Sequence, residues 1–171
     1  AGWIGFPRFR LQGSASSAQK EAITSNTEAF YHFKEGKLLL ERRKWEEQDA
    51  ALEHFDTAIR MDPNFAEAFA GRAAVELWQY LGLRSNTDMV QARRDIDRAL
   101  ELNPSSSFAH LTLCRMKVTY DWDFVKGEQA CLKAIELDPN NQDAHFELAM
   151  FRSMFGRVDE ALAEIDTAIK L

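Results

Sequence analysis

The sequence predicts an all-α protein, a right-handed α-solenoid of about four helix-turn-helix units. A short phrase recurs along the 171 residues, reading AIRMDPN from Ala58, ALELNPS from Ala99, AIELDPN from Ala134 and AIKL from Ala168. The spacing of small and bulky apolar residues before each phrase also recurs, and another amphipathic segment precedes each of them. Repetition at such intervals is typical of stacked helical repeats.

The second helix of each unit is expected to carry the pattern small-x3-apolar-x2-Ala-x4-Pro, although the chain reaches Leu171 before a fourth proline would fall. The residues that fill the three apolar places in order are Ala51, Phe55 and Ala58, then Ala92, Ile96 and Ala99, then Gly127, Cys131 and Ala134, then Ala161, Ile165 and Ala168. Positions four and seven apart share one helix face, so each helix presents small, large and small residues to a neighbour. Pro63, Pro104 and Pro139 are expected to end the helices, because proline disfavours helical geometry in the residue before it.

An amphipathic first helix is expected before each of these helices. Counted from Ala66, Ser107 and Gln142, the fourth place holds Phe69, His110 and His145, and the eighth holds Ala73, Cys114 and Ala149, with Gly36 in the first unit. The expected units are residues 25–63, 66–104, 107–139 and 142–171.

Capping residues support these helix starts. Ser25 to Glu28, reading SNTE, is a candidate capping box, with Ser25 as the N-cap. Asn86 or Thr87 is expected to cap the second helix of the second unit, and Asp121 or Asp123 that of the third. The connections ERRKWEEQD and YLGLRSNT are longer than the turn around Gly156 and are expected to be loops.

These features resemble the tetratricopeptide repeat, a 34-residue helix-turn-helix unit with the pattern W-x2-L-G-x2-Y, then A-x3-F, then P. Leu148-Ala149 stands at the Leu-Gly place of the first helix, and Gly156 at the turn. The resemblance covers residues 25–171 and departs from the pattern in the enlarged connections of the first two units. It implies eight helices and a protein-binding role without catalysis.

YHFKEGKLLLERR, the connection of the second unit and TYDWDFVKGEQACLKAIELDPNN look similar to the tetratricopeptide segment of bacterial multidomain signalling and transcription-regulator proteins. There the segment is joined to a winged-helix domain, a nucleotide cyclase or a kinase, often across one membrane helix. The resemblance implies that residues 1–24 form a tail or juxtamembrane linker, with AGWIGF and the following arginines as the exit from a membrane helix upstream of residue 1. The alternative is a frayed terminus that carries a few aromatic residues.

The composition argues against nucleic-acid binding by this region. The chain has 21 Lys and Arg against 27 Asp and Glu, with a pI near 5.3, whereas nucleic-acid binders usually show a basic face. No run of 18 apolar residues occurs, and the start lacks the pattern of a signal peptide. The compartment stays open between a membrane-tethered periplasmic location and the cytoplasm.

Cys114 and Cys131 are expected to be buried free thiols that act as small hydrophobic residues. The alternative is a bridge between adjacent helices in an oxidising compartment.

The four histidines are not expected to bind metal or catalyse a reaction. His110 and His145 occupy the same fourth place of successive units, normally a large packing position, and His32 is a candidate counterpart in the first unit. His54 is expected to sit alone on a second helix. The sequence has no H-E-x-x-H, no phosphate-binding glycine loop and no G-x-S-x-G, so we expect no enzyme activity, no metal and no cofactor.

The family resemblance implies a concave groove lined by the first helices, with places 2, 5, 9 and 12 pointing into it. The groove residues carried over in this way are Phe33, Lys37, Ala70, Ala74, Leu77, Leu111, Arg115, Phe146 and Met150. Such an apolar groove with two basic residues suits a helix or an extended apolar segment that carries an acidic group. Packing between repeats is the alternative role for each residue. Phe33 and Gly71 stand where a carboxylate clamp would need polar residues, so chaperone-type binding is disfavoured.

We therefore expect an interaction scaffold for a protein or peptide, part of a larger signalling or regulatory protein. The alternative is a small-ligand sensor domain of a membrane-anchored regulator. The last helix is expected to leave an apolar flank open, which suggests a homodimer.

Overall fold

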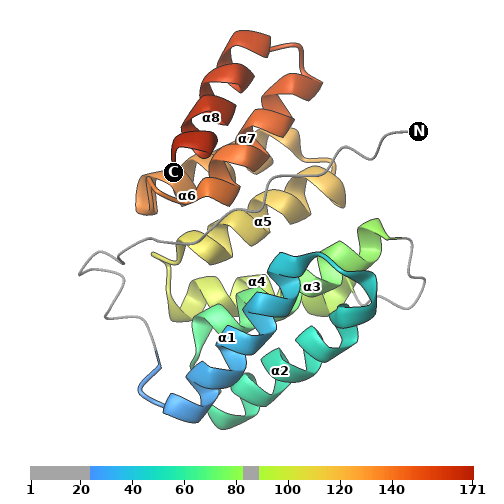
Figure 1. Ribbon diagram of the computed structural model, residues 1–171, viewed down its shortest axis with the longest axis vertical. Coiled ribbons are helices and arrows are strands. Elements are labelled where there is room, and N and C mark those ends of the chain that lie inside the picture. The colour runs from blue at the N-terminus through green and yellow to red at the C-terminus, as the bar shows by residue number, and fades with distance from the viewer. Residues whose placement is uncertain (1–23, 83–88) are drawn as a thin grey trace.

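The computed structural model describes residues 24–82 and 89–171 (Figure 1). These ranges are all helical apart from turns, and they contain no strand. The helices are α1 (Thr27–Arg42), the short 3-10 helix η2 (Trp45–Glu47), α2 (Gln48–Met61), α3 (Ala66–Leu81), α4 (Met89–Leu102), α5 (Ser107–Thr119), α6 (Phe124–Leu137), α7 (Gln142–Met154) and α8 (Val158–Lys170). The predicted all-α solenoid is confirmed.

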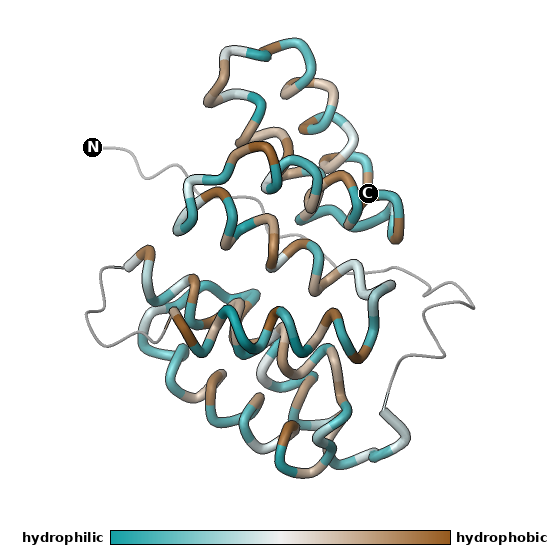
Figure 2. Tube along the Cα trace, turned by 180° about the vertical axis from the view of Figure 1, so that it is seen from behind, coloured by the Kyte–Doolittle hydropathy of each residue, from teal (hydrophilic) through white to brown (hydrophobic). Residues whose placement is uncertain are grey.

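The helices pack as four successive hairpins. Within each hairpin the first helix lies against the second: α1 on α2, α3 on α4, α5 on α6 and α7 on α8. Between hairpins, α3 contacts α1 and α5, and α5 also contacts α7, so the first helices form a continuous row through the stack (Figure 1). Figure 2 shows hydrophobic and hydrophilic residues interspersed along the helices.

The recurring small and large residues form the hairpin cores. Phe55 is completely buried, and its ring lies between α1 and α3. A Cβ atom at Gly36 would come within 3.1 Å of that ring, and one at Gly71 within 2.3 Å. Glycine at position 71 therefore lets α3 approach the ring, and the contact at Gly36 of α1 is tight but milder.

The recurring Asp-Pro and Asn-Pro phrases end the helices and form the same turn three times. The residue two positions after each Asp or Asn donates its backbone N–H to that side chain: Asn64 to Asp62 at 2.9 Å, Ser105 to Asn103 at 3.1 Å and Asn140 to Asp138 at 3.1 Å. An oxygen acceptor is what Asp and Asn share, so either residue serves in this turn.

The first helix is capped by a different residue from the predicted one. Asn26, not Ser25, is the N-cap of α1, and its side-chain oxygen accepts from the backbone N–H groups of Glu28 and Ala29. The side-chain amide of Asn26 also donates to the backbone oxygen of Met61 at 3.0 Å, which a serine could not reproduce. Asp123 caps α6 as predicted. The other predicted caps, Asn86 and Thr87, lie outside the described residues.

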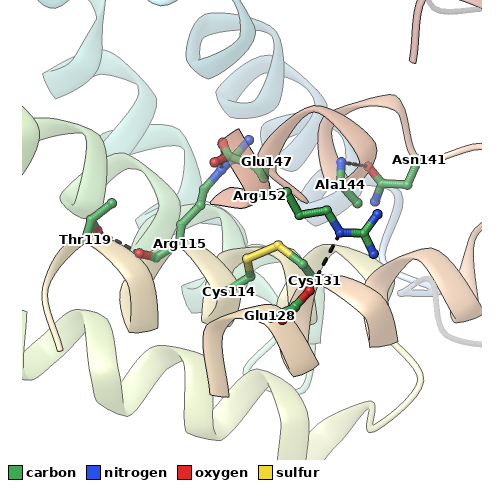
Figure 3. Close-up of a disulfide and its surroundings, with 9 residues drawn as sticks. All are labelled: Cys114, Arg115, Thr119, Glu128, Cys131, Asn141, Ala144, Glu147 and Arg152. Atoms are coloured by element: carbon green, nitrogen blue, oxygen red, sulfur yellow. Dashed lines mark hydrogen bonds and ion pairs between the residues drawn. A yellow bond between two sulfur atoms is a disulfide. The ribbon is translucent and has the colours of Figure 1, made fainter. Parts of the chain in front are cut away.

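The two cysteines are not free thiols, contrary to the principal expectation. Cys114 on α5 and Cys131 on α6 form a disulfide, and both residues are buried as predicted (Figure 3). In the second unit the place of Cys114 is taken by Ala73 and that of Cys131 by Ile96. These two residues belong to one core cluster. The alternative of a bridge between adjacent helices is therefore the one that the structure shows.

Charged residues join neighbouring units. Arg72 of α3 binds Asp56 of α2 and makes a two-point contact with Asp95 of α4 at 2.6 and 2.7 Å. Asp95 is almost fully buried, and burial of a carboxylate is tolerated because this contact neutralises it. These hydrogen bonds raise the pKa of Arg72.

A second charged cluster joins the second and third units. Asp121, just after α5, accepts from Arg93 of α4, with one contact of 3.0 Å, and from Lys117 at 2.7 Å. The hydrogen bond from Arg93, followed by that from Lys117, lowers the pKa of Asp121 to about 2. The carboxylate is therefore ionised throughout the neutral range.

Candidate partner-binding face

The row of α1, α3, α5 and α7 forms one face of the stack, and this face curves inward. Arg43, which follows α1, lies 3.9 Å from the carboxylate of Asp143 in the first turn of α7. Successive units are stacked in order, so only an inward curve brings the first unit within reach of the fourth. We call the surface between Arg43 and Asp143 the concave face.

Five of the nine predicted groove residues are buried and pack between helices. They are Phe33, Ala70, Ala74, Leu77 and Leu111, none more than 7% exposed. Phe33 shows the cause: its ring lies 5.0 Å from that of Phe65 and 6.1 Å from that of Phe55, measured between ring centroids. In this arrangement the five side chains serve packing between helices, and their part in binding stays a prediction.

Arg115 is not an unpaired cation. Its Nε donates to Glu147 of α7 at 2.7 Å (Figure 3). Its Nη2 lies 3.7 Å from Asp143. Burial disfavours the charged form of Arg115, but the two carboxylates outweigh it and raise the pKa. Arg115 thus holds α5 to α7.

Lys37 also has partners. Its Nζ lies 3.8 Å from Glu41 on the next turn of α1 and 5.5 Å from the centre of the Phe108 ring. Burial raises the pKa of Glu41, and Lys37 opposes the shift while the charge of Asp143 adds to it. The concave face therefore carries carboxylates as well as cations, and Glu41, Asp143 and Glu147 were missed by the sequence analysis.

Aromatic side chains adjoin these charges. The rings of Trp45 and Trp78 are stacked with their centroids 5.1 Å apart, and the Arg43 guanidinium lies 5.5 Å from the centre of the Trp78 ring. Trp45 is 47% exposed, so part of the stack is accessible. Of the remaining predicted residues, Phe146 is half-buried and Met150 is 50% exposed.

The histidines make structural contacts. His145 lies between Glu164 at 2.5 Å and the backbone oxygen of Pro139 at 3.1 Å, and His110 contacts the equivalent oxygen of Pro104 at 3.0 Å. His54 is not alone, because its Nδ1 lies 3.0 Å from that of His32. Among residues 24–82 and 89–171, no group of three or more His, Cys, Asp or Glu side chains could hold a metal ion.

No helix in the described part of the chain combines the length and apolar character needed to cross a membrane.

Comparisons with known proteins agree with this architecture. The family model for the tetratricopeptide repeat matches residues 130–163, which include α7. Among solved structures, the chain is similar to TTC0263, a thermophilic tetratricopeptide-repeat protein of Thermus thermophilus, with 20% identity and a TM-score of 0.70 over 90% of this chain and 77% of that one. MamA from Desulfovibrio magneticus RS-1 is similar with 21% identity and a TM-score of 0.54, over 84% and 75% of the respective chains.

The search of curated proteins gives no match. At these identities the structural neighbours show the fold alone. Residues 130–163 thus match the tetratricopeptide repeat, and the described chain shares the fold of tetratricopeptide-repeat proteins.

Proposed function

We propose that the chain is an interaction scaffold that binds a segment of a partner protein on its concave face. The tetratricopeptide fold is generally a non-catalytic, protein-binding one, and the chain carries it. One observation carries the finer proposal: accessible charges from the first and fourth units meet on this face beside an accessible tryptophan stack. Arg43 and Asp143 are about half exposed, with side-chain exposures of 48% and 54%.

An exposed ion pair at 3.9 Å contributes little stability, of the order of 0–1 kcal/mol. A partner's charged groups can therefore replace one member of the pair at small cost. The neighbouring tryptophans supply apolar area, and aromatic and arginine side chains are the types that dominate binding energy at interfaces. The proposed ligand is accordingly a peptide segment with apolar side chains and with charges of either sign, which broadens the amphipathic helix or extended apolar segment with an acidic group expected from the sequence.

The experiment compares partner capture by the wild-type chain, the Arg43→Glu variant and a matched control, Arg60→Glu. Arg60 is likewise an exposed arginine at the end of a helix, but it belongs to α2, outside the row that lines the concave face. Arg43→Glu should weaken binding at least about tenfold, equivalent to about 1.4 kcal/mol. Arg60→Glu should bind like the wild type.

Equal binding by both variants would contradict the concave site. A small molecule that raises the melting temperature, with no protein captured, would favour the sensor alternative. Membership of a larger signalling or regulatory protein stays a prediction that the capture experiment in source cells also tests.

A further inference from the structure

Two histidines face each other between the first two helices. The Nδ1 atoms of His32 on α1 and His54 on α2 lie 3.0 Å apart, and the two ring centroids are 5.2 Å apart. Both residues are half-buried, so solvent reaches them. One Nδ1 donates its proton and the other accepts it, which requires that at least one imidazole is neutral. We call His32 and His54 the histidine pair.

The same two places of the fourth unit carry a histidine and a carboxylate. His145 stands at the place of His32, and Glu164 at the place of His54. The Nδ1 of His145 contacts Glu164 at 2.5 Å, and its Nε2 contacts a backbone oxygen at 3.1 Å, so both ring nitrogens are occupied. In the second unit the place of His54 again carries a carboxylate, Asp95. The first unit therefore has a second imidazole where these two units have an acidic side chain.

We propose that the histidine pair binds one divalent transition-metal ion, Zn²⁺, through its two Nδ1 atoms. Neutral imidazole is the commonest protein ligand for metal ions. Zinc lies about 2.0–2.1 Å from a histidine nitrogen, so two ligand nitrogens of a tetrahedral ion are roughly 3.3 Å apart. The present distance of 3.0 Å therefore needs only a small rotation of either ring to admit the ion. The donating ring then carries its proton on Nε2 instead of Nδ1.

Packing beside the pair holds the two rings near this separation. Phe33 follows His32 and Phe55 follows His54, both phenylalanines are buried, and their ring centroids lie 6.1 Å apart between α1 and α2. The hydrophobic core thus fixes the two helix segments that carry the histidines. Ligands on packed helices keep their positions better than ligands on loops, which favours metal binding.

The proposed site is an open one. Two protein nitrogens leave the other positions of a tetrahedral ion to water, which reaches the half-buried pair. Such an ion joins α1 to α2 and stabilises the first hairpin. This proposal departs from the expectation that the histidines bind no metal. It does not depend on the concave face, because His54 belongs to α2, outside the row that lines that face.

Calorimetric titration with Zn²⁺, in a chain without an affinity tag, tests the site. The wild type should bind one ion, and His32→Gln and His54→Gln should each weaken the binding at least about tenfold. His145→Gln is the matched control, because it removes the imidazole at the equivalent place of the fourth unit and should bind like the wild type. Circular dichroism in the presence of a chelator should show equal helix content in all four chains.

Nuclear magnetic resonance of the imidazole nitrogens identifies the ligands. Zn²⁺ should move the Nδ1 resonances of His32 and His54 and leave those of His110 and His145 unchanged. A wild type that binds no Zn²⁺ up to millimolar concentration would overturn the proposal and leave the pair as a hydrogen bond between helices. Undiminished binding by both single variants, or a shift of only one of the two Nδ1 resonances, would place the ion elsewhere and overturn it too.

Discussion

Replacement of Gly71 by alanine tests whether the ring of Phe55 fixes the distance between the first two units. A Cβ atom at Gly71 would lie 2.3 Å from the ring, well inside van der Waals contact. The same edge of the ring also lies close to Gly36, where a Cβ would be 3.1 Å away, which limits how far the ring can move. Overpacking of this kind costs about 1–3 kcal/mol, whereas alanine in place of glycine inside a helix gains about 1 kcal/mol.

The net expectation is a free energy of unfolding lower by up to about 2 kcal/mol for Gly71→Ala. Urea unfolding followed by circular dichroism measures it. Gly36→Ala is the matched control, since it has the same gain in helix propensity and a milder contact with the same ring. In a Phe55→Leu background the penalty of Gly71→Ala should shrink, because the ring is gone. If Gly71→Ala were as stable as Gly36→Ala in the wild-type background, the ring would not be the constraint.

Three further expectations concern local contacts. The pKa of Asp121 is lowered from 3.8 to about 2. Its contribution to stability, about 2 kcal/mol, is therefore present at neutral pH and lost as the pH falls from about 4 to about 2. Asp121→Asn should flatten the dependence of the melting temperature on pH in that window. Asn26→Ala should cost about 1 kcal/mol of stability in urea unfolding, and Ser25→Ala much less. Equal losses for the two variants would contradict the assignment of Asn26 as the N-cap. The unreduced, denatured chain should show no titratable thiol, and a reductant should lower stability by about 3 kcal/mol, because the Cys114–Cys131 bridge closes a loop of 17 residues.

The helices could be predicted from the sequence because each depends on a local rule. Proline after Asp62, Asn103 and Asp138 ends a helix wherever it occurs, and a small-large-small stripe packs in the same way in every unit. The disulfide left a usable signal: Cys114 and Cys131 stand at two places whose equivalents, Ala73 and Ile96, share a core cluster in the second unit. The sequence analysis nevertheless favoured free thiols, because buried cysteines usually act as small hydrophobic residues.

The charges of the concave face could not be predicted in this way. The approach of Arg43 to Asp143 depends on the curvature of the whole stack, and residue spacing within one unit does not give that curvature. Likewise, Ser25 and Asn26 are both good capping residues, and the contact of Asn26 with Met61 at the end of α2 decides between them. Sequence patterns thus located the packing residues better than the charged residues of the concave face.

The disulfide also bears on how the stack opens. In an array of repeats each hairpin packs mainly against its neighbours, so local unfolding is expected to start at the ends and spread inward. The covalent link between α5 and α6 makes the third hairpin a barrier to that spread. Backbone amides of the fourth hairpin should exchange hydrogen independently of the first two, with the slowest exchange in α5 and α6. The bridge is thus expected to make the third hairpin the most persistent part of the stack.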